Sequence, residues 1–418
     1  MIRAELLVTG IGELATLAEG PVPRVGAAMS ELGRLHDAAL AVDGGRLVYV
    51  GPASGARREV RLRRGGRRWE LDGSTVVPGL VDAHTHALFA GDRAGELPQK
   101  LAGLPYGEIA RRGGGLFATV RATRAASREA LEGPTAARLL RMGAEGSTTI
   151  EVKSGYGLSV AAELRLLETV PRLRRRTGLR LVATFLGAHA VPPEFAGRAD
   201  AYIDLLVRRA LPEVARRGLA RFCDVFAEPG FFSAAQAARL LRAATALGLG
   251  TKIHADEFVA AGGARLAARL GVRSAEHLLA TGAADRRALA RAGVTAVLLP
   301  VTPFASLARP RSPGRAMVDD GVPVALGSDC SPNSWVEAMP LVLAHAVYSA
   351  RLTPAEALTA ATVNAAHAVD AAGEAGLLAV GRPAEFAVFD VPSADHLGYR
   401  IGLRPTAVYR QGFDVSSR

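Results

Sequence analysis

The chain has 418 residues, of which 49% are hydrophobic and 22% are charged, a balance that excludes a wholly disordered protein and supports a large buried core. The formal net charge of +11 comes from scattered arginine clusters, and aromatic residues make up only 5%, which argues against a nucleic-acid-binding face. Two cysteines are too few for a disulfide framework, and without a signal-like N-terminus or an apolar run of roughly 20 residues we expect a cytoplasmic protein with no membrane contact.

Both ends of the chain are predicted to form short strands. Asp43-Gly44-Gly45 is typical of a hairpin turn, because glycine adopts the positive φ angles that such turns need. Two β-rich ends that flank a different middle predict one small, discontinuous β-sandwich domain, made from residues 1–75 and 369–418. The strand candidates lie at residues 38–42, 46–50, 69–71, 386–389 and 407–410.

The middle of the chain, residues 76–368, alternates between apolar strand-like runs and helical stretches such as residues 161–176 and 233–246. Alternating helices and continuously apolar strands favour a parallel sheet covered by helices. Eight such units over roughly 290 residues predict the α/β fold class, in the form of a (β/α)8 TIM barrel. The eight strand candidates are residues 75–84, 147–153, 180–186, 221–226, 250–254, 272–276, 294–299 and 322–326.

Polar residues recur where these strands end, and in a (β/α)8 barrel the carboxyl ends of the strands face the reaction site. Five of the nine histidines lie there, which packing alone does not explain. In chain order, the polar strand-end residues are His84 and His86, Glu151 and Lys153, His189, Glu228, His254 and Glu257, His277, and Asp329.

His84 and His86 are predicted to bind one metal ion. Side chains at positions i and i+2 of a strand point to the same side, and His254 and Asp329 complete a set of four ligands from the fifth and eighth strands. Mixed histidine and carboxylate ligation suits Zn²⁺ or Fe. We expect metal-bound hydroxide as the nucleophile, Asp329 as the proton shuttle and His277 as the group that polarises the carbonyl. The structural alternative is that His84 and His86 are buried core histidines.

Five longer motifs resemble those of one family. Residues 77–86 (VPGLVDAHTH) resemble the opening motif of the amidohydrolase superfamily. The others resemble signatures of its imidazolonepropionase family, and the resemblance extends over nearly the whole chain. These motifs are residues 151–158 (EVKSGYGL), 184–190 (TFLGAHA), 252–258 (KIHADEF) and 274–278 (SAEHL).

The resemblance implies hydrolysis of the cyclic amide of 4-imidazolone-5-propanoate to N-formimidoyl-L-glutamate in L-histidine degradation. It also implies one Zn²⁺ or Fe³⁺ per subunit, and a homodimer. The implied metal ligands are His84, His86, His254 and Asp329. The implied contacts to this small-molecule substrate are Arg93, Tyr156 and His189, with Glu257 on the imidazolone ring and His277 as the polarising catalytic residue.

Each of these roles has a structural alternative. An arginine fork suits the propanoate carboxylate, but Arg93 also has acidic neighbours in sequence. The alternatives are an ion pair of Arg93 with Asp92 or Glu96, loop packing for Tyr156, a loop hydrogen bond for His189, a helix-start charge for Glu257, and a hydrogen bond from His277 to Glu276.

Lys153 bears on the number of metal ions. Some amidohydrolases bridge two metals with a carbamylated lysine on the fourth barrel strand. Lys153 lies on the second strand, and the fourth offers Asp224 and Glu228 instead, so we predict a mononuclear site. Two roles stay open for Lys153, which are pairing with Glu151 and positioning the Tyr156 loop.

The segment after the last predicted ligand departs from the family pattern. Asn-Pro-Gly followed by Ser or Thr is usual there, whereas this chain has Ser331-Pro332-Asn333-Ser334. In the family this loop contacts substrate or product, so Ser331, Asn333 and Ser334 are predicted substrate contacts with altered details.

Two other functions stay open. The departure at this loop favours a related amidohydrolase that acts on another small heterocycle. The second alternative is an inactive barrel that serves as a binding or scaffold protein, and the intact ligand set argues against it.

Overall fold

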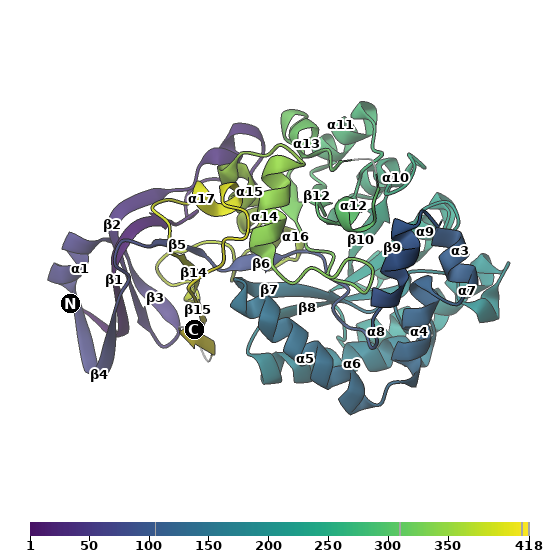
Figure 1. The fold of residues 1–418 in the computed structure, drawn as a ribbon, viewed down its shortest axis with the longest axis horizontal. Coiled ribbons are helices and arrows are strands. Elements are labelled where there is room, and N and C mark those ends of the chain that lie inside the picture. The colour runs from purple at the N-terminus through teal and green to yellow at the C-terminus, as the bar shows by residue number, and fades with distance from the viewer. Residues whose placement is uncertain (105, 309–310, 411–412, 417–418) are drawn as a thin grey trace.

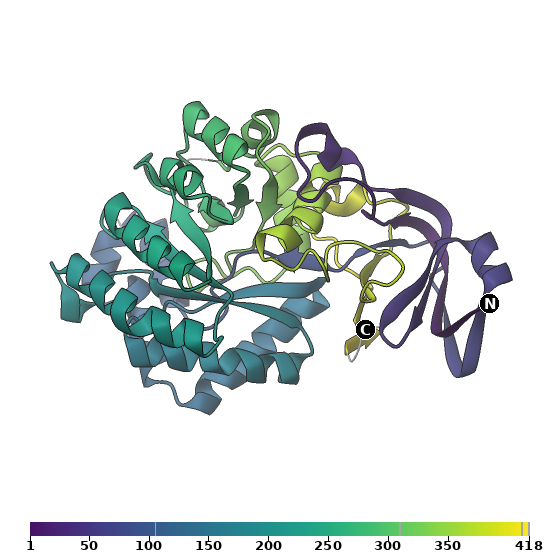
Figure 2. The same ribbon diagram turned by 180° about the vertical axis from the view of Figure 1, so that it is seen from behind.

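The computed structural model describes residues 1–104, 106–308, 311–410 and 413–416, and in this part of the chain it has two β-sheets. Strands from both ends of the chain form one sheet, and the middle of the chain forms a barrel beside it (Figure 1). The terminal sheet lies at one end of the molecule, with the N-terminus at its outer side (Figure 2). Among the described residues, no helix combines the length and the apolarity that crossing a bilayer requires.

The terminal sheet has the strand order β16-β15-β14-β5-β1-β2-β3, and β4 also pairs with β1. The discontinuous terminal domain predicted from sequence is therefore confirmed. Its strands are β1 (Ile2–Ala15), β2 (Arg34–Asp43), β3 (Arg46–Pro52), β4 (Val60–Glu70), β5 (Thr75–Pro78), β14 (Glu385–Phe389), β15 (Ala407–Arg410) and β16 (Phe413–Ser416).

The two layers expected of a sandwich are joined by hydrogen bonds into one continuous sheet. The joining strand is β1, which is long enough to pair with strands of both layers. Its first half pairs with β4, and its end pairs with β5. The sheet bends around an apolar core, so that the rings of Trp69 on β4 and Phe386 on β14 lie 6.1 Å apart. The predicted hairpin turn joins β2 to β3, with φ angles of 56° at Gly44 and 72° at Gly45.

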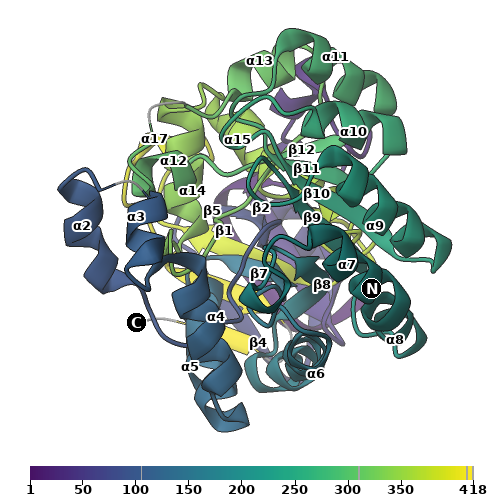
Figure 3. The same ribbon diagram turned by 90° about the vertical axis from the view of Figure 1, so that its right-hand side faces the viewer.

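The barrel is built from eight parallel strands in sequential order, from β6 to β13, which confirms the predicted (β/α)8 architecture. Helices surround these strands (Figure 3). The strands are β6 (Leu80–Asp82), β7 (Ser147–Lys153), β8 (Arg180–Ala188), β9 (Phe222–Ala227), β10 (Gly250–Ala255), β11 (Ser274–His277), β12 (Thr295–Leu298) and β13 (Val324–Leu326).

Backbone hydrogen bonds close the barrel between its first and last strands. The Ala83 amide donates to Leu326 at 3.2 Å, and the Asp329 amide donates to His84 at 3.0 Å. This closure brings residues that are about 250 positions apart in sequence to the same point, which places Asp329 beside the His84 segment.

The first barrel strand is shorter than the predicted segment at residues 75–84, and this prediction was wrong. The segment is split into β5, which belongs to the terminal sheet, and β6, which begins the barrel. Pro78 ends β5 because it lacks the N–H group that a continued ladder needs. A side chain at Gly79 would overlap Thr148, so the crossing between the two sheets needs glycine.

Helices connect the barrel strands, and their ends follow capping rules. The Ser159 side chain caps α6 at its start, and Gly178 ends it at φ 68°, while Ser233 and Gln236 form a capping box on α9. The helices are α1 (Ala53–Glu59), α2 (Leu97–Leu101), α3 (Tyr106–Arg111), α4 (Gly115–Ala125), α5 (Arg128–Ala144), α6 (Val160–Thr177), α7 (Ala199–Leu205), α8 (Leu211–Arg216), α9 (Ala234–Ala246), α10 (Gly263–Leu270), α11 (Ala283–Ala292), α12 (Thr302–Ala305), α13 (Gly314–Asp319), α14 (Met339–Tyr348), α15 (Pro354–Ala360), α16 (Val363–Ala368) and α17 (His396–Tyr399). Shorter 3-10 turns are η1 (Gly26–Ser30), η2 (Ala94–Glu96) and η3 (Pro193–Phe195), and η4 (Leu206–Ala210) is a π-helical turn.

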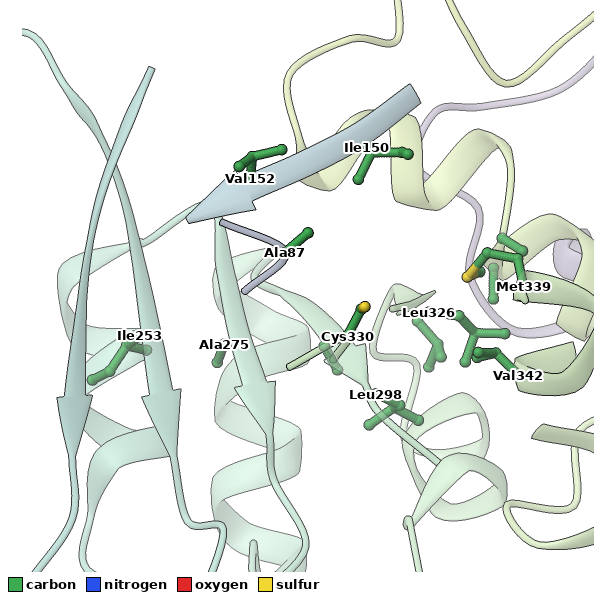
Figure 4. Close-up of a cluster of buried hydrophobic side chains, with 14 of the residues drawn as sticks. Ala87, Ile150, Val152, Ile253, Ala275, Leu298, Leu326, Cys330, Met339 and Val342 are labelled. Carbon is green, nitrogen blue, oxygen red and sulfur yellow. The ribbon is translucent and has the colours of Figure 1, made fainter. Parts of the chain in front are cut away.

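Alternate residues of the strands that carry site residues, such as β10 and β11, lie in two different environments. Ile253, Ala275 and Leu298 belong to the apolar core around the barrel (Figure 4), whereas their neighbours His254 and Glu276 take part in a buried polar cluster. This alternation follows from the two-residue repeat of a strand.

Candidate functional site

The predicted site residues gather around one cavity of about 560 Å³ at the carboxyl ends of the barrel strands. His84 and Ser334 are buried next to it. The residues predicted from sequence that line the cavity are His86, Arg93, Tyr156, His189, His254, Glu257, His277, Asp329, Ser331 and Asn333.

The four predicted metal ligands place their nitrogen and oxygen atoms close to one another. His86 Nε2 lies 3.2 Å from His84 Nε2 and 3.3 Å from His254 Nε2. Asp329 Oδ1 lies 3.5 Å from His84 Nε2 and 3.6 Å from His86 Nε2. A tetrahedral ion with ligands at about 2.0–2.1 Å spaces neighbouring ligand atoms by about 3.3–3.4 Å, and these four spacings lie near that value. His84, His86 and Asp329 form one group that could hold a metal ion, and His254 adjoins this group through His86.

Two buried carboxylates orient the imidazole rings. His84 Nδ1 lies 2.6 Å from Glu276 Oε2, and His254 Nδ1 lies 3.0 Å from Asp224 Oδ2. With a carboxylate facing each Nδ1 atom, the Nε2 atom of each ring is directed to the centre of the cluster. This carboxylate–histidine arrangement is typical of metal-binding histidines.

A layer of buried charges lies below these histidines. Lys153 Nζ lies 2.8–2.9 Å from carboxylate oxygens of Glu151, Asp224 and Glu276. Lys252 Nζ lies 2.8 Å from Glu151 and 3.2 Å from Glu276. Pairing with Glu151 was one of the two roles left open for Lys153, and the structure adds Asp224 and Glu276. We call these five residues the charge layer.

The electrostatics of this region favour a bound cation. Three carboxylates face two ammonium groups in the charge layer, and Asp329 adds a further negative charge, so with neutral imidazoles these groups have a formal charge of −2. Although His84 is buried, Glu276 and Asp329 raise its pKa to about 9, as expected where a positive charge is favoured. Burial lowers the pKa of Lys153, but Asp224, Glu151 and Glu276 together raise it above its ordinary value. Burial, with His189 and His84 nearby, holds the pKa of His86 well below its usual range, which keeps its ring neutral.

His277 and Glu257 face each other at the cavity wall, with His277 Nε2 3.7 Å from Glu257 Oε2. Burial lowers the pKa of His277 to about 3, so the ring is neutral at pH 7. Burial and the charge of Asp329 raise the pKa of Glu257 to about 8. The alternative for His277 was a hydrogen bond to Glu276, but Glu276 contacts His84 instead. The alternative for Glu257 was a charge at the start of a helix, but the next helix, α10, begins only at Gly263.

Two site residues have strained backbones. His277 has a φ angle of 69° and Asp329 one of 53°, in the left-handed region that side chains rarely adopt. Such strain concentrates at functional sites. Asp329 Oδ2 also accepts a hydrogen bond of 2.9 Å from Thr302 Oγ1, so the oxygen expected to be free for proton transfer already has a donor.

Arg93 is buried and bonded to an acid, as the alternative for this residue predicts. Its Nε and Nη2 atoms donate to Glu96 Oε2 at 3.0 and 2.8 Å. The other oxygen of Glu96 accepts from the Gly115 amide at 2.7 Å. Arg93 still lines the cavity, so the ion pair and a substrate contact are compatible.

His189 and Tyr156 pack beside the predicted ligands. The His189 ring stacks on His86 at 4.9 Å, and Tyr156 lies 5.3 Å from His189. His189 Nδ1 donates to the Gly155 carbonyl at 3.0 Å, and burial lowers its pKa to about 3. A neutral ring that donates through Nδ1 can only accept through Nε2. The loop hydrogen bond named as the alternative for His189 is therefore present, and it leaves Nε2 of the neutral ring as an acceptor.

The loop at residues 331–334 forms a tight turn at the cavity. Ser331 Oγ accepts from the Ser334 amide at 3.2 Å, and the Ser331 amide donates to the Ser334 carbonyl at 3.0 Å. The Asn333 side chain points outward from this turn and accepts a hydrogen bond of 2.8 Å from Lys100 Nζ.

Several functional residues were missed from sequence. Glu276 and Lys252 each lie within two residues of a predicted site histidine, and the i, i+2 rule places Lys252 on the same strand face as His254. Lys100 carried no comparable local signal. The cavity also has an aromatic wall made of Phe226, Phe231 and Phe258, of which only Phe258 lies within a motif quoted above.

Comparisons with known proteins agree with this geometry. The model of the amidohydrolase family matches residues 89–400. Imidazolonepropionase from Symbiobacterium thermophilum is 48% identical over 405 residues, which cover 96% of this chain and 95% of that protein. Imidazolonepropionase from Geobacillus kaustophilus is 43% identical over 417 residues, covering 98% of this chain and 97% of that protein.

Solved structures share the fold at low identity. An adenosine deaminase from Xanthomonas campestris, solved with bound zinc, has a TM-score of 0.69 at 21% identity and covers 99% of this chain and 93% of its own. Guanine deaminase from E. coli has a TM-score of 0.70 at 16% identity and covers 99% of both chains.

Proposed function

The chain belongs to the imidazolonepropionase family of the amidohydrolases, and from this membership we propose that it hydrolyses 4-imidazolone-5-propanoate to N-formimidoyl-L-glutamate in L-histidine degradation. The observation that carries the proposal is the convergence of His84, His86, His254 and Asp329 at a cavity in a chain with such relatives. Water adds to the ring carbonyl carbon, the carbonyl C–N bond breaks, and the freed nitrogen gains a proton.

These four residues would hold one Zn²⁺ or Fe³⁺ ion. Their buried, converging donor atoms and the negative charge beneath them suit a cation, and the mixture of imidazole and carboxylate suits these two metals. A bound metal ion lowers the pKa of a coordinated water and supplies a nucleophile near neutral pH. The set argues against an inactive scaffold, because unpaired buried polar groups are costly without a ligand.

Three side chains are placed to handle charge and protons. Asp329, steadied by Thr302, takes a proton from the attacking water and passes it to the leaving ring nitrogen. His277 donates a hydrogen bond to the substrate carbonyl as negative charge develops on its oxygen. Glu257, whose Oε2 atom lies 3.7 Å from His277 Nε2, contacts the ring nitrogens of the substrate.

The rest of the cavity matches a flat ring with an anionic tail. Phe226 and its aromatic neighbours pack against the ring, and His189 Nε2 accepts a hydrogen bond from a ring N–H group. Arg93 and Tyr156 bind the propanoate. Ser331, Asn333 and Ser334 contact substrate or product from the opposite loop.

A direct assay tests the proposal. The purified protein, loaded separately with Zn²⁺ and with Fe, is incubated with 4-imidazolone-5-propanoate, and N-formimidoyl-L-glutamate is detected by NMR. We expect stoichiometric product and one metal ion per subunit by mass spectrometry, with a homodimer by light scattering. Absence of this product from metal-loaded protein would refute the activity.

The departure at Ser331-Pro332-Asn333 favours one competing function, an amidohydrolase for another small heterocycle. Guanine and hydantoins are therefore assayed in parallel. We expect kcat/KM for 4-imidazolone-5-propanoate to exceed theirs, and faster turnover of either competitor would replace the proposed substrate.

A further inference from the structure

Among the residues that the structure describes, Arg93 and Lys100 are the cationic side chains that line the cavity, and they differ in how their charge is matched. Arg93 forms two hydrogen bonds to Glu96, whose formal charge cancels its own. Lys100, on α2, also lines the cavity, and its bonding partner is the neutral amide oxygen of Asn333 at 2.8 Å. Among the residues that the structure describes, no carboxylate oxygen lies within 4 Å of Lys100 Nζ. Arg93, Lys100 and Glu96 together therefore carry a formal charge of +1, and of the two cations only Arg93 is bonded directly to the carboxylate.

The bonding of Lys100 leaves capacity for a ligand. An ammonium group has three N–H donors, and Asn333 takes one of them. The side chain is half-buried, and its pKa is lowered by burial first and by the positive charge of Arg93 second, although Glu96 acts in the opposite direction, so the ammonium charge is held there at a cost. A carboxylate bound there removes this cost and gains charge-assisted hydrogen bonds.

We propose that Lys100 is a second binding residue for the substrate carboxylate, and that Asn333 positions it. This inference rests on the proposed function, since it assigns the anionic tail of that substrate to a particular cation. Arg93, paired with Glu96, then offers hydrogen-bond donors to the substrate carboxylate, and Lys100 provides the positive charge that balances it.

The rarity of lysine in this chain gives independent support. Of 51 basic residues only three are lysines, and the other two, Lys153 and Lys252, belong to the charge layer. Where solvent-exposed cations serve, this chain uses arginine. All three lysines occur where a compact ammonium contacts defined acceptors inside the barrel or at its cavity.

The Lys100–Asn333 hydrogen bond depends on a residue at which this chain departs from the family pattern. Asn333 occupies the position where the family pattern has glycine, which has no side chain to accept a hydrogen bond. Its Nδ2 also donates to Ser306 Oγ at 3.3 Å. The amide thus joins three segments across the cavity, those that follow β6, β12 and β13, and holds the flexible lysine stem in place.

The test compares Lys100→Met, Asn333→Gly and the double variant with the wild-type holoenzyme. Arg121→Met is the matched control, since it removes an exposed positive charge from α4 outside the cavity. KM and kcat are measured with 4-imidazolone-5-propanoate. Binding of 3-(imidazol-4-yl)propanoate and of 4-propylimidazole, which lacks the carboxylate, is measured by calorimetry.

We expect Lys100→Met to raise KM by about 10- to 100-fold, the usual range for a lost hydrogen bond to a charged group, with kcat changed less than about threefold. Binding of the imidazolylpropanoate weakens by a similar factor, and binding of 4-propylimidazole stays the same. Asn333→Gly gives a smaller rise in KM, and adds less to Lys100→Met than it causes alone, because part of its effect acts through the Lys100 contact.

Each contrary result has a distinct meaning. An unchanged KM in Lys100→Met, or equal weakening of both imidazoles, overturns the role of Lys100. Additive effects in the double variant overturn the positioning role of Asn333. If the wild type does not turn over 4-imidazolone-5-propanoate, the proposed function fails, and the two imidazoles still decide whether Lys100 binds a carboxylate.

Discussion

The interiors of the barrel and of the terminal sheet are built on different principles. The barrel encloses the charge layer, five ionised side chains with no exposed surface. The terminal sheet encloses an apolar cluster that includes Leu14, Val76 and Phe386. Buried ion pairs contribute little net stability, because desolvation offsets their attraction, whereas apolar burial is strongly favourable.

This difference separates what orients the site from what stabilises the fold. The charge layer holds Glu276 and Asp224 against two predicted metal ligands. None of the site residues described above lies on a strand of the terminal sheet. Substitutions in the two interiors should therefore change different measured quantities, and four variants test this in order of their expected effect on turnover.

Substituting His84→Ala should have the largest effect. Loss of one ligand removes the bound metal and with it several kcal/mol of transition-state stabilisation, so kcat/KM should fall at least about 10³-fold. Metal content is measured by mass spectrometry beside activity. His396→Ala, a histidine remote from the cavity, serves as the control and should retain both. Full activity in His84→Ala would remove it from the ligand set.

His277→Ala should lower kcat by about 10²- to 10³-fold, the usual cost of removing a hydrogen bond to a developing oxyanion. The metal content should stay at the wild-type level, because His277 polarises the substrate in the proposed mechanism. Loss of metal from this variant would show instead that His277 is a ligand.

Lys153→Met tests the charge layer itself. It leaves three buried carboxylates with one ammonium, so the free energy of unfolding should fall by about 3–5 kcal/mol. Because Glu276 and Asp224 then lose their counter-charge and no longer hold the imidazoles in place, metal affinity should fall by about 10- to 100-fold. Urea unfolding and competitive metal titration measure the two effects. A variant with wild-type metal affinity would reduce the layer to a structural role.

Phe386→Ala should have the smallest effect on turnover. Phe386 is fully buried and stacks on Tyr409 with ring centroids 5.0 Å apart, so truncation should cost about 3–5 kcal/mol of stability. The kcat of the folded enzyme should change less than about twofold. A large fall in kcat would contradict the separation between the two interiors, because it would couple the terminal sheet to the site.

Much of the fold was predictable because its signals are local. The apolar runs at residues 147–153 and 250–254 match β7 and β10, and the glycine turn at Asp43-Gly44-Gly45 forms as expected. The split of residues 75–84 was not predicted, because the choice between two sheets depends on β14, about 300 residues away. The continuous form of the terminal sheet likewise depends on β1 reaching both β4 and β5.

The site divides in the same way. The two-residue repeat of a strand was enough to pair His84 with His86 and to place both at a strand end. The same repeat did not show that Lys153 bonds Asp224 and Glu276, since these contacts join different strands. The partner of Asp329 Oδ2, Thr302, also comes from another loop.

The sequence by itself determined the barrel, the terminal domain and the residue types that suit a metal hydrolase, because periodicity and spacing act over a few residues. Only the tertiary structure decided which charges meet: closure of the barrel set Lys153 among three carboxylates, matched Arg93 with Glu96 inside the cavity, and brought Lys100 to Asn333 across 233 residues. Such contacts depend on the relative position of distant segments, and Coulomb and hydrogen-bond energies are steep functions of that distance.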